Sequence, residues 1–191
     1  MRKELRVLFV SFLLVADIAA ASGSPTASSP QNKNQRSEEK YREKLVKEVR
    51  HQLVMLPWYS VFDNLAFQVE GDKVILSGQV TRPTLKSDAE AAVKSIEGVA
   101  SVVNNIEVLP VSPMDDQLRR ALFRAIYSDP GLQRYAIQAI PSIHIIVKNG
   151  NVTLEGVGDS ETDKNLAGLR ANEVPNVFSV KNNLVVAGNS K

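Results

Sequence analysis

The sequence predicts an α+β protein made of two tandem copies of one small α-β-β-α-β domain, each with two helices packed on a three-stranded mixed sheet. Three observations support this prediction. The chain repeats itself at a shift of 78 residues, each copy alternates helical with strand-like hydrophobic spacing, and turns rich in glycine or asparagine separate the segments.

The internal repeat is specific. Between Val74 and Val108, 12 of 35 positions carry the residue found 78 positions later, where unrelated segments would share roughly two. The shared residues in the first copy are Val74, Leu76, Gly78, Thr84, Lys86, Ala89, Val99, Ser101, Val102, Asn104, Asn105 and Val108. Most are aliphatic residues, glycine or asparagine, which build a fold and carry little chemistry. The repeat therefore indicates a duplicated scaffold, not a duplicated catalytic site.

The chain begins with the pattern of an export signal. Basic residues precede the apolar run 7–15 and the small residues 19–22, so residues 1–21 are predicted to be a cleaved signal peptide, with an uncleaved anchor as the alternative. The run is too short to span a bilayer comfortably, so no transmembrane span is expected in the mature form. The sequence contains no cysteine, which excludes a lipid-anchored lipoprotein, a disulfide and a thiolate metal site. A periplasmic protein is predicted.

The segment 22–39 and the overall charge set further limits. Residues 22–39 are almost entirely polar, which predicts a flexible linker. Lys and Arg number 23 and Asp and Glu 21, a formal net charge of +2. A nearly neutral chain is not expected to capture nucleic acid by bulk electrostatics.

The first domain is predicted to span residues 40–110. An apolar stripe at helical spacing predicts a helix from Tyr41 to Leu56, ended by Pro57. Alternating apolar residues on both sides of the turn 70–73 predict a hairpin with one buried face. Ser87 and Glu90 suggest a capping box for a second helix, which Gly98 ends. A last strand follows over 99–108.

The second domain, residues 114–187, is predicted to repeat this order. Leu118, Leu122 and Ile126 form the stripe of its first helix. The pair Asn149-Gly150 is a strong hairpin signal. Asn176 replaces Gly98, and asparagine is the next best residue for a left-handed helix cap. Proline and glycine at other equivalent positions make this copy the one expected to be less stable.

These motifs resemble those of the BON domain, named for the bacterial osmotically inducible protein Y and nodulation proteins. The resemblance rests on Val-x-Leu-x-Gly, an alanine-bearing helix, and Gly/Asn-Val-x-x-Val-x-Asn in each copy. The structural motif residues are Gly78, Gly98, Asn104, Gly156, Asn176 and Asn182. The resemblance implies two helices against a three-stranded mixed sheet. It also implies a role in envelope maintenance: association with phospholipid membranes, osmotic or envelope stress, and chaperone-like behaviour in some members. It implies no universal catalytic residue.

Three aromatic residues after the first helix are candidates for lipid or partner contact. They are Trp58, Tyr59 and Phe62, and Trp58 is the only tryptophan. An exposed aromatic loop can insert at a membrane interface. The alternative is that Trp58 and Phe62 close the core between the helix and the first strand.

A second candidate surface lies on the first helix of the second copy. Arg119, Arg120 and Arg124 are predicted to lie along one side of it, with Phe123 and Tyr127 beside the core stripe. Arginines beside exposed aromatics suit an anionic lipid surface. Alternatively, the arginines form a solvated face and the aromatics contact the sister domain.

The sequence offers little support for an enzyme. His51 and His144 have no partner at metal-ligand spacing and are interpreted as surface histidines. No Gly-x-Ser-x-Gly elbow and no phosphate-binding glycine loop is present. No cofactor, metal site or catalytic residue is therefore predicted.

The predicted function is that of an exported, non-enzymatic binding protein. Its expected partners are a phospholipid membrane surface or envelope proteins. One alternative is a periplasmic chaperone or adaptor that binds protein through an exposed apolar surface or a free sheet edge. Another is a structural scaffold module. The sequence does not define the ligand or the oligomeric state.

Overall fold

The computed structural model of the 191-residue chain describes residues 30–138 and 140–188. The predicted signal peptide, residues 1–21, lies outside the described residues, and so does the first part of the predicted linker, residues 22–29.

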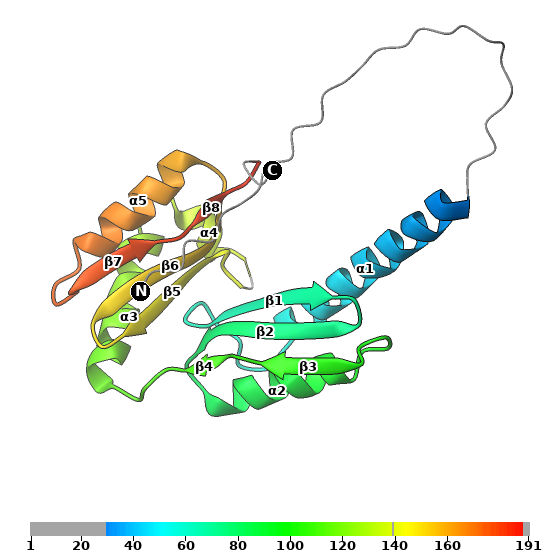
Figure 1. The fold of residues 1–191 in the computed structure, drawn as a ribbon. Helices are drawn as coiled ribbons and strands as arrows, with labels where there is room; N and C mark the ends of the chain where they lie inside the picture. Colours follow the sequence, from blue (N-terminus) through cyan, green and yellow to red (C-terminus); the bar gives the residue numbers. More distant parts are fainter. Residues whose placement is uncertain (1–29, 139, 189–191) are drawn as a thin grey trace, which may run out of the picture.

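The first domain has the predicted order of elements (Figure 1). They are α1 (Pro30–Val54), β1 (Asn64–Glu70), β2 (Lys73–Val80), α2 (Pro83–Lys94), β3 (Ser101–Asn104) and β4 (Glu107–Val108). The central strand β2 pairs antiparallel with β1 and parallel with both β3 and β4. Because β3 and β4 share the third position, the sheet is the predicted three-stranded mixed sheet, with its last strand broken in the middle.

The second domain repeats this topology. Its elements are α3 (Pro113–Tyr127), α4 (Gln133–Ala136), β5 (Ile143–Lys148), β6 (Asn151–Gly158), α5 (Glu161–Asn172), β7 (Ser179–Asn182) and β8 (Val185–Val186). The hairpins share one register, since Phe67 faces Leu76 and Ile145 faces Leu154. The short helix α4 was not predicted.

Helix α1 differs from the expectation. It begins at Pro30, so residues 30–39, predicted as flexible linker, are helical. Residues 36–44 are exposed and rich in Glu, Lys and Arg, which favour helix without any burial. The apolar stripe starts only at Leu45 and continues through Val49 and Leu53. Hydrophobic spacing therefore marked only the packed half of the helix.

The start of α2 corrects a second expectation. The helix begins at Pro83, and Ser87 lies one turn inside it, where its hydroxyl donates to the carbonyls of Pro83 and Thr84. The predicted capping box is therefore absent from this copy. In the second copy, Ser160 is the N-cap and accepts from the Asp163 amide.

The shared glycines occupy backbone conformations that require them. Gly78 and Gly156 have φ of +112° and +110°. A Cβ at either would lie 2.1 Å or 2.0 Å from a carbonyl oxygen of the preceding strand region, at Asn64 or Ser142. Gly98 and its replacement Asn176 also have positive φ, which confirms the predicted equivalence of the two caps.

The shared asparagines tie each last strand to a helix. The Asn104 side chain donates to the Lys86 carbonyl at 2.9 Å and accepts from the Ile106 amide at 3.2 Å. Asn182 makes the equivalent bonds at 2.7 Å and 3.2 Å. Each therefore satisfies backbone groups at the break in the third strand and holds the crossover helix in place.

Candidate functional site

The loop after α1 presents Trp58 to solvent. Its side chain is 67% exposed, and its backbone has φ of +69°. For a non-glycine residue, such a conformation costs roughly 1–3 kcal/mol and persists only where neighbouring contacts hold it. The Arg82 guanidinium lies 4.9 Å from the ring centroid. The structure therefore agrees with the interpretation in which Trp58 is exposed, and not with the alternative in which it closes the core.

A buried carboxylate, Asp63, holds this loop. Its side chain is fully buried and accepts four hydrogen bonds, from the amides and hydroxyls of Ser60 and Thr81, at 2.6 to 3.0 Å. These bonds join the loop to the segment before α2, next to Arg82. Asp63 was not among the predicted site residues. Its signal is Ser60 three residues before the aspartate, the spacing of a capping box, in which the carboxylate accepts from the serine amide.

The other two predicted aromatics point toward the second domain. The Phe62 ring packs edge-on against Phe123, with centroids 6.3 Å apart. Tyr59 stacks on His144 at 5.6 Å. Burial raises the pKa of Tyr59 to about 12. Phe62 and Tyr59 therefore connect the domains, and only Trp58 of the three faces solvent.

The predicted arginine row is divided between interior and surface. Arg119 is only 5% exposed, and its guanidinium donates to the Val147 carbonyl at 2.8 Å and pairs with Asp116. Its prediction as a surface cation is wrong, because this side of α3 faces β5. Arg120 and Arg124 are exposed.

The two aromatics on α3 differ as well. Phe123 is 37% exposed and contacts both Phe62 and Tyr127. Tyr127 is buried, and its hydroxyl donates to the Ile143 carbonyl. Burial raises the pKa of Tyr127 far above its ordinary value. Phe123 thus contacts the sister domain, which was the alternative to lipid contact.

One surface brings the exposed predicted residues together. We call it the aromatic-basic surface; it comprises Trp58, Arg82, Val111, Met114, Arg120 and Arg124. These residues line two adjoining grooves of about 540 and 390 Å³ that share Arg120. Val111 is 96% and Met114 59% exposed. The surface thus combines three guanidinium groups with an indole and aliphatic side chains.

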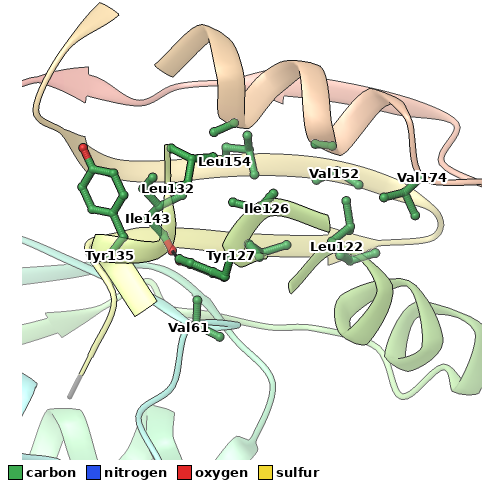
Figure 2. Packing of buried hydrophobic residues seen from close by; sticks show 14 of the residues in the cluster. Val61, Leu122, Ile126, Tyr127, Leu132, Tyr135, Ile143, Val152, Leu154 and Val174 are labelled. Carbon is green, nitrogen blue, oxygen red and sulfur yellow. Dashed lines mark hydrogen bonds between the residues drawn. The ribbon is translucent and has the colours of Figure 1, made fainter. Parts of the chain in front are cut away.

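The domains also join through backbone and ionic contacts. The Ile145 amide in β5 donates to the Val61 carbonyl at 2.8 Å. Val61 belongs to the core of the second domain and lies below Tyr127 in Figure 2. Lys148 forms an ion pair with Glu107 of the first domain.

His144 is buried in this contact, so its interpretation as a surface histidine is wrong. It is 9% exposed, and burial lowers its pKa below the ordinary value for histidine. Strand periodicity placed it on the polar face of β5, which Tyr59 of the other domain covers.

A polar cluster is specific to the second domain. Asp163 lies 78 positions after the core residue Leu85, yet it is 5% exposed. It accepts from the Tyr135 hydroxyl at 2.9 Å and pairs with Arg134. This cluster fixes α4 against the start of α5. The sequence signal was the aspartate at a core position of the repeat.

The described residues contain no cluster of three His, Cys, Asp or Glu side chains placed to bind a metal ion. No helix within residues 30–138 and 140–188 is long and apolar enough to cross a membrane.

Comparisons with known proteins place these features in a family. Two solved structures from Chlamydia trachomatis are similar, both described as CdsD, a structural protein of the type III secretion system. One shares 13% identity over 75% of this chain and 92% of that chain, with a TM-score of 0.28. The other, the C-terminal domain, shares 14% over 74% and 96%, with a TM-score of 0.27. At these TM-scores the likeness supports no conclusion about fold or function.

No curated protein matches the chain. The family model of the BON domain matches twice, at residues 43–110 and 114–188. The two matches coincide with the two α-β-β-α-β units and their glycine and asparagine motifs. The chain therefore belongs to the BON domain family, as a tandem of two BON domains.

Proposed function

We propose that this chain is an exported, non-enzymatic binding protein of the bacterial envelope that attaches to anionic phospholipid surfaces through its aromatic-basic surface. It acts in the periplasm, in osmotic or envelope stress. The observation that carries the proposal is the solvent-exposed Trp58, which a buried aspartate network holds beside Arg82 and close to Arg120.

The family supports the binding role. BON domains are non-enzymatic binding domains that are known to bind phospholipids and occur in envelope stress proteins. Export to the periplasm rests on the signal pattern of residues 1–21.

The chemistry of the surface suits a lipid headgroup region. An indole is favoured at the boundary between water and acyl chains. Each arginine near an anionic membrane contributes about 1 kcal/mol, so Arg82, Arg120 and Arg124 together contribute about 3 kcal/mol at low salt. Ions screen this attraction within about 10 Å at 0.1 M salt, so binding should weaken as salt rises. In the described part of the chain, neither Arg120 nor Arg124 forms an ion pair.

Vesicle binding tests this proposal. Residues 22–191 are mixed with vesicles of phosphatidylglycerol and phosphatidylcholine, and co-sedimentation and Trp58 fluorescence are measured. We expect binding that rises with anionic lipid and falls with salt, and a blue shift of the tryptophan emission. R120E/R124E should bind at least tenfold more weakly.

The matched control is K40E/K47E, which makes the same charge change at exposed positions of α1. Equal weakening by both double variants, or an emission spectrum that vesicles do not change, would contradict the proposal. Suppression of client aggregation without vesicle binding would favour an adaptor instead.

A further inference from the structure

A segment of the first domain fills a groove in the second domain. This groove lies between α3 and β5. Val61 accepts the hydrogen bond of the Ile145 amide, and Phe62 packs on Phe123 of α3. As a result, Ile143 and Ile145 are completely buried. The second domain thus receives a turn of the first domain at its sheet edge, through one backbone hydrogen bond.

The first domain has a corresponding groove at the edge of β1, which is open although residues of both domains line it. Its walls are α1, through Arg42, Val46 and Arg50, the edge strand β1 over residues 64–69, and the second domain, through residues 140–142, 144, 156 and 157. Its volume is about 720 Å³. Leu65 and Phe67, the equivalents of Ile143 and Ile145, remain partly exposed.

The edge of β1 has a free bonding position. The two hairpins share one register, so the Phe67 amide points outward as the Ile145 amide does. The Tyr59 hydroxyl bonds to the Leu65 backbone, but among the described residues no backbone carbonyl from another segment accepts a hydrogen bond from the outer side of β1. An unpaired edge of this kind is a template for an added strand.

Charge selects the occupant. Arg42 and Arg50 are exposed on the α1 wall, and none of the described residues that line the groove carries a carboxylate. The remainder of the wall and floor is mostly apolar. A segment with apolar side chains and at least one carboxylate therefore fits it.

A second copy of this chain does not supply such a segment. The counterpart of the loop after α1 is residues 135–142, which contain no acidic residue. Its Tyr135 is also buried in bonds to Asp163. The segment 60–62 is already engaged within its own chain.

We propose that the groove between α1 and β1 binds an extended peptide segment of another protein, with apolar residues and a carboxylate, as an added strand on β1. This site is separate from the aromatic-basic surface and does not depend on lipid binding. It would make the chain an adaptor that recognises a partner by its backbone and acidic character.

A labelled peptide tests the site. The probe carries the sequence of residues 57–64, because the chain uses this segment in the equivalent groove, and binding to residues 22–191 is followed by fluorescence anisotropy. We expect saturable binding below 1 mM, on the order of the weakest specific affinities. R42E/R50E should weaken binding at least tenfold, whereas K40E/K47E should leave it within about twofold, because only the first pair lines the groove.

Two further measurements locate the peptide. A probe with lysine in place of aspartate should bind R42E/R50E more tightly than the unaltered chain. The NMR signal of the Phe67 amide should shift on binding, and F67P, which removes this donor at an edge position, should lose peptide binding while it keeps vesicle binding. Circular dichroism checks that F67P is folded.

Several outcomes would overturn the site. One is the absence of peptide binding at 1 mM, and another is an equal loss of peptide affinity in both double variants. A third is a shift of the NMR signal of the Ile145 amide instead of the Phe67 amide, which would mean that the probe displaces the chain's own segment. If the protein forms dimers that the R42E/R50E substitution dissociates but the peptide probe does not, the groove binds a second copy of the chain. Because R120E/R124E should impair vesicles alone and R42E/R50E the peptide alone, this proposal and the lipid proposal can fail independently.

Discussion

Replacing Asp63 by asparagine should destabilise the first domain by about 2–4 kcal/mol, since it removes an acceptor that four donors share. One oxygen of Asp63 accepts from the amide and hydroxyl of Thr81, the other from those of Ser60. Asparagine keeps the shape and turns one oxygen into an NH₂ donor. The facing hydroxyl can rotate and accept, but the facing backbone amide loses its partner in a buried site. An unpaired buried donor costs about 1–3 kcal/mol, and the remaining bonds lose their charge assistance.

Urea unfolding at pH 7 measures this effect, with Trp58 fluorescence as a reporter inside the loop. Asp72→Asn is the matched control, because Asp72 is exposed in the hairpin turn; its effect should stay within about 0.5 kcal/mol. Asp63→Asn should also change the emission of the folded protein, since the loop is no longer held beside Arg82. A loss below about 0.5 kcal/mol for Asp63→Asn would refute the view that this carboxylate holds the loop.

Two other predictions concern the glycines and His144. Gly78→Ala should lower the free energy of unfolding in urea by more than about 3 kcal/mol, because its Cβ would lie 2.1 Å from a backbone oxygen. The control Gly71→Ala has open space around it and should cost about 1 kcal/mol. Similar losses for the two variants would contradict this reasoning. The pKa of His144 is depressed in the fold by burial, against the opposing influence of Asp63 and Glu155, so its contribution to stability is present above pH 6.5 and is lost as pH falls through the folded-state pKa. His144→Phe, which keeps a ring against Tyr59, should therefore reduce the stability that is lost as the pH falls below 6.5. An unchanged pH dependence would show that another group is responsible.

The sequence was sufficient for the features that arise within one copy. The hairpins, the crossover helices and the left-handed caps at Gly98 and Asn176 follow from local backbone rules that hold wherever the copy lies. The repeat itself strengthened each assignment, because two different residues meeting one backbone requirement are better support than either residue alone.

Features that depend on burial between the copies were not predictable in this way. Arg119 has the spacing of a surface residue, and only the position of β5 and the Val147 carbonyl makes it interior. Val61 and Phe62 were assigned to the first domain by their place in the chain, whereas Val61 packs in the second core. The exposed half of α1 was not predicted as helix, because a polar segment with helical propensity but no apolar stripe has the composition of a linker.

The position of Val61 makes the two domains unequal in their dependence on one another. The first domain contains every segment of its own core, but the second borrows Val61, and the edge of β5 is covered only while the first domain is folded. Local unfolding of the first domain therefore exposes a long apolar strand edge, which is a template for aggregation. The N-terminal domain is also synthesised first, so the protective segment is in place when β5 emerges. The second domain alone should therefore be less soluble than the full chain, whereas the first domain alone keeps a complete core.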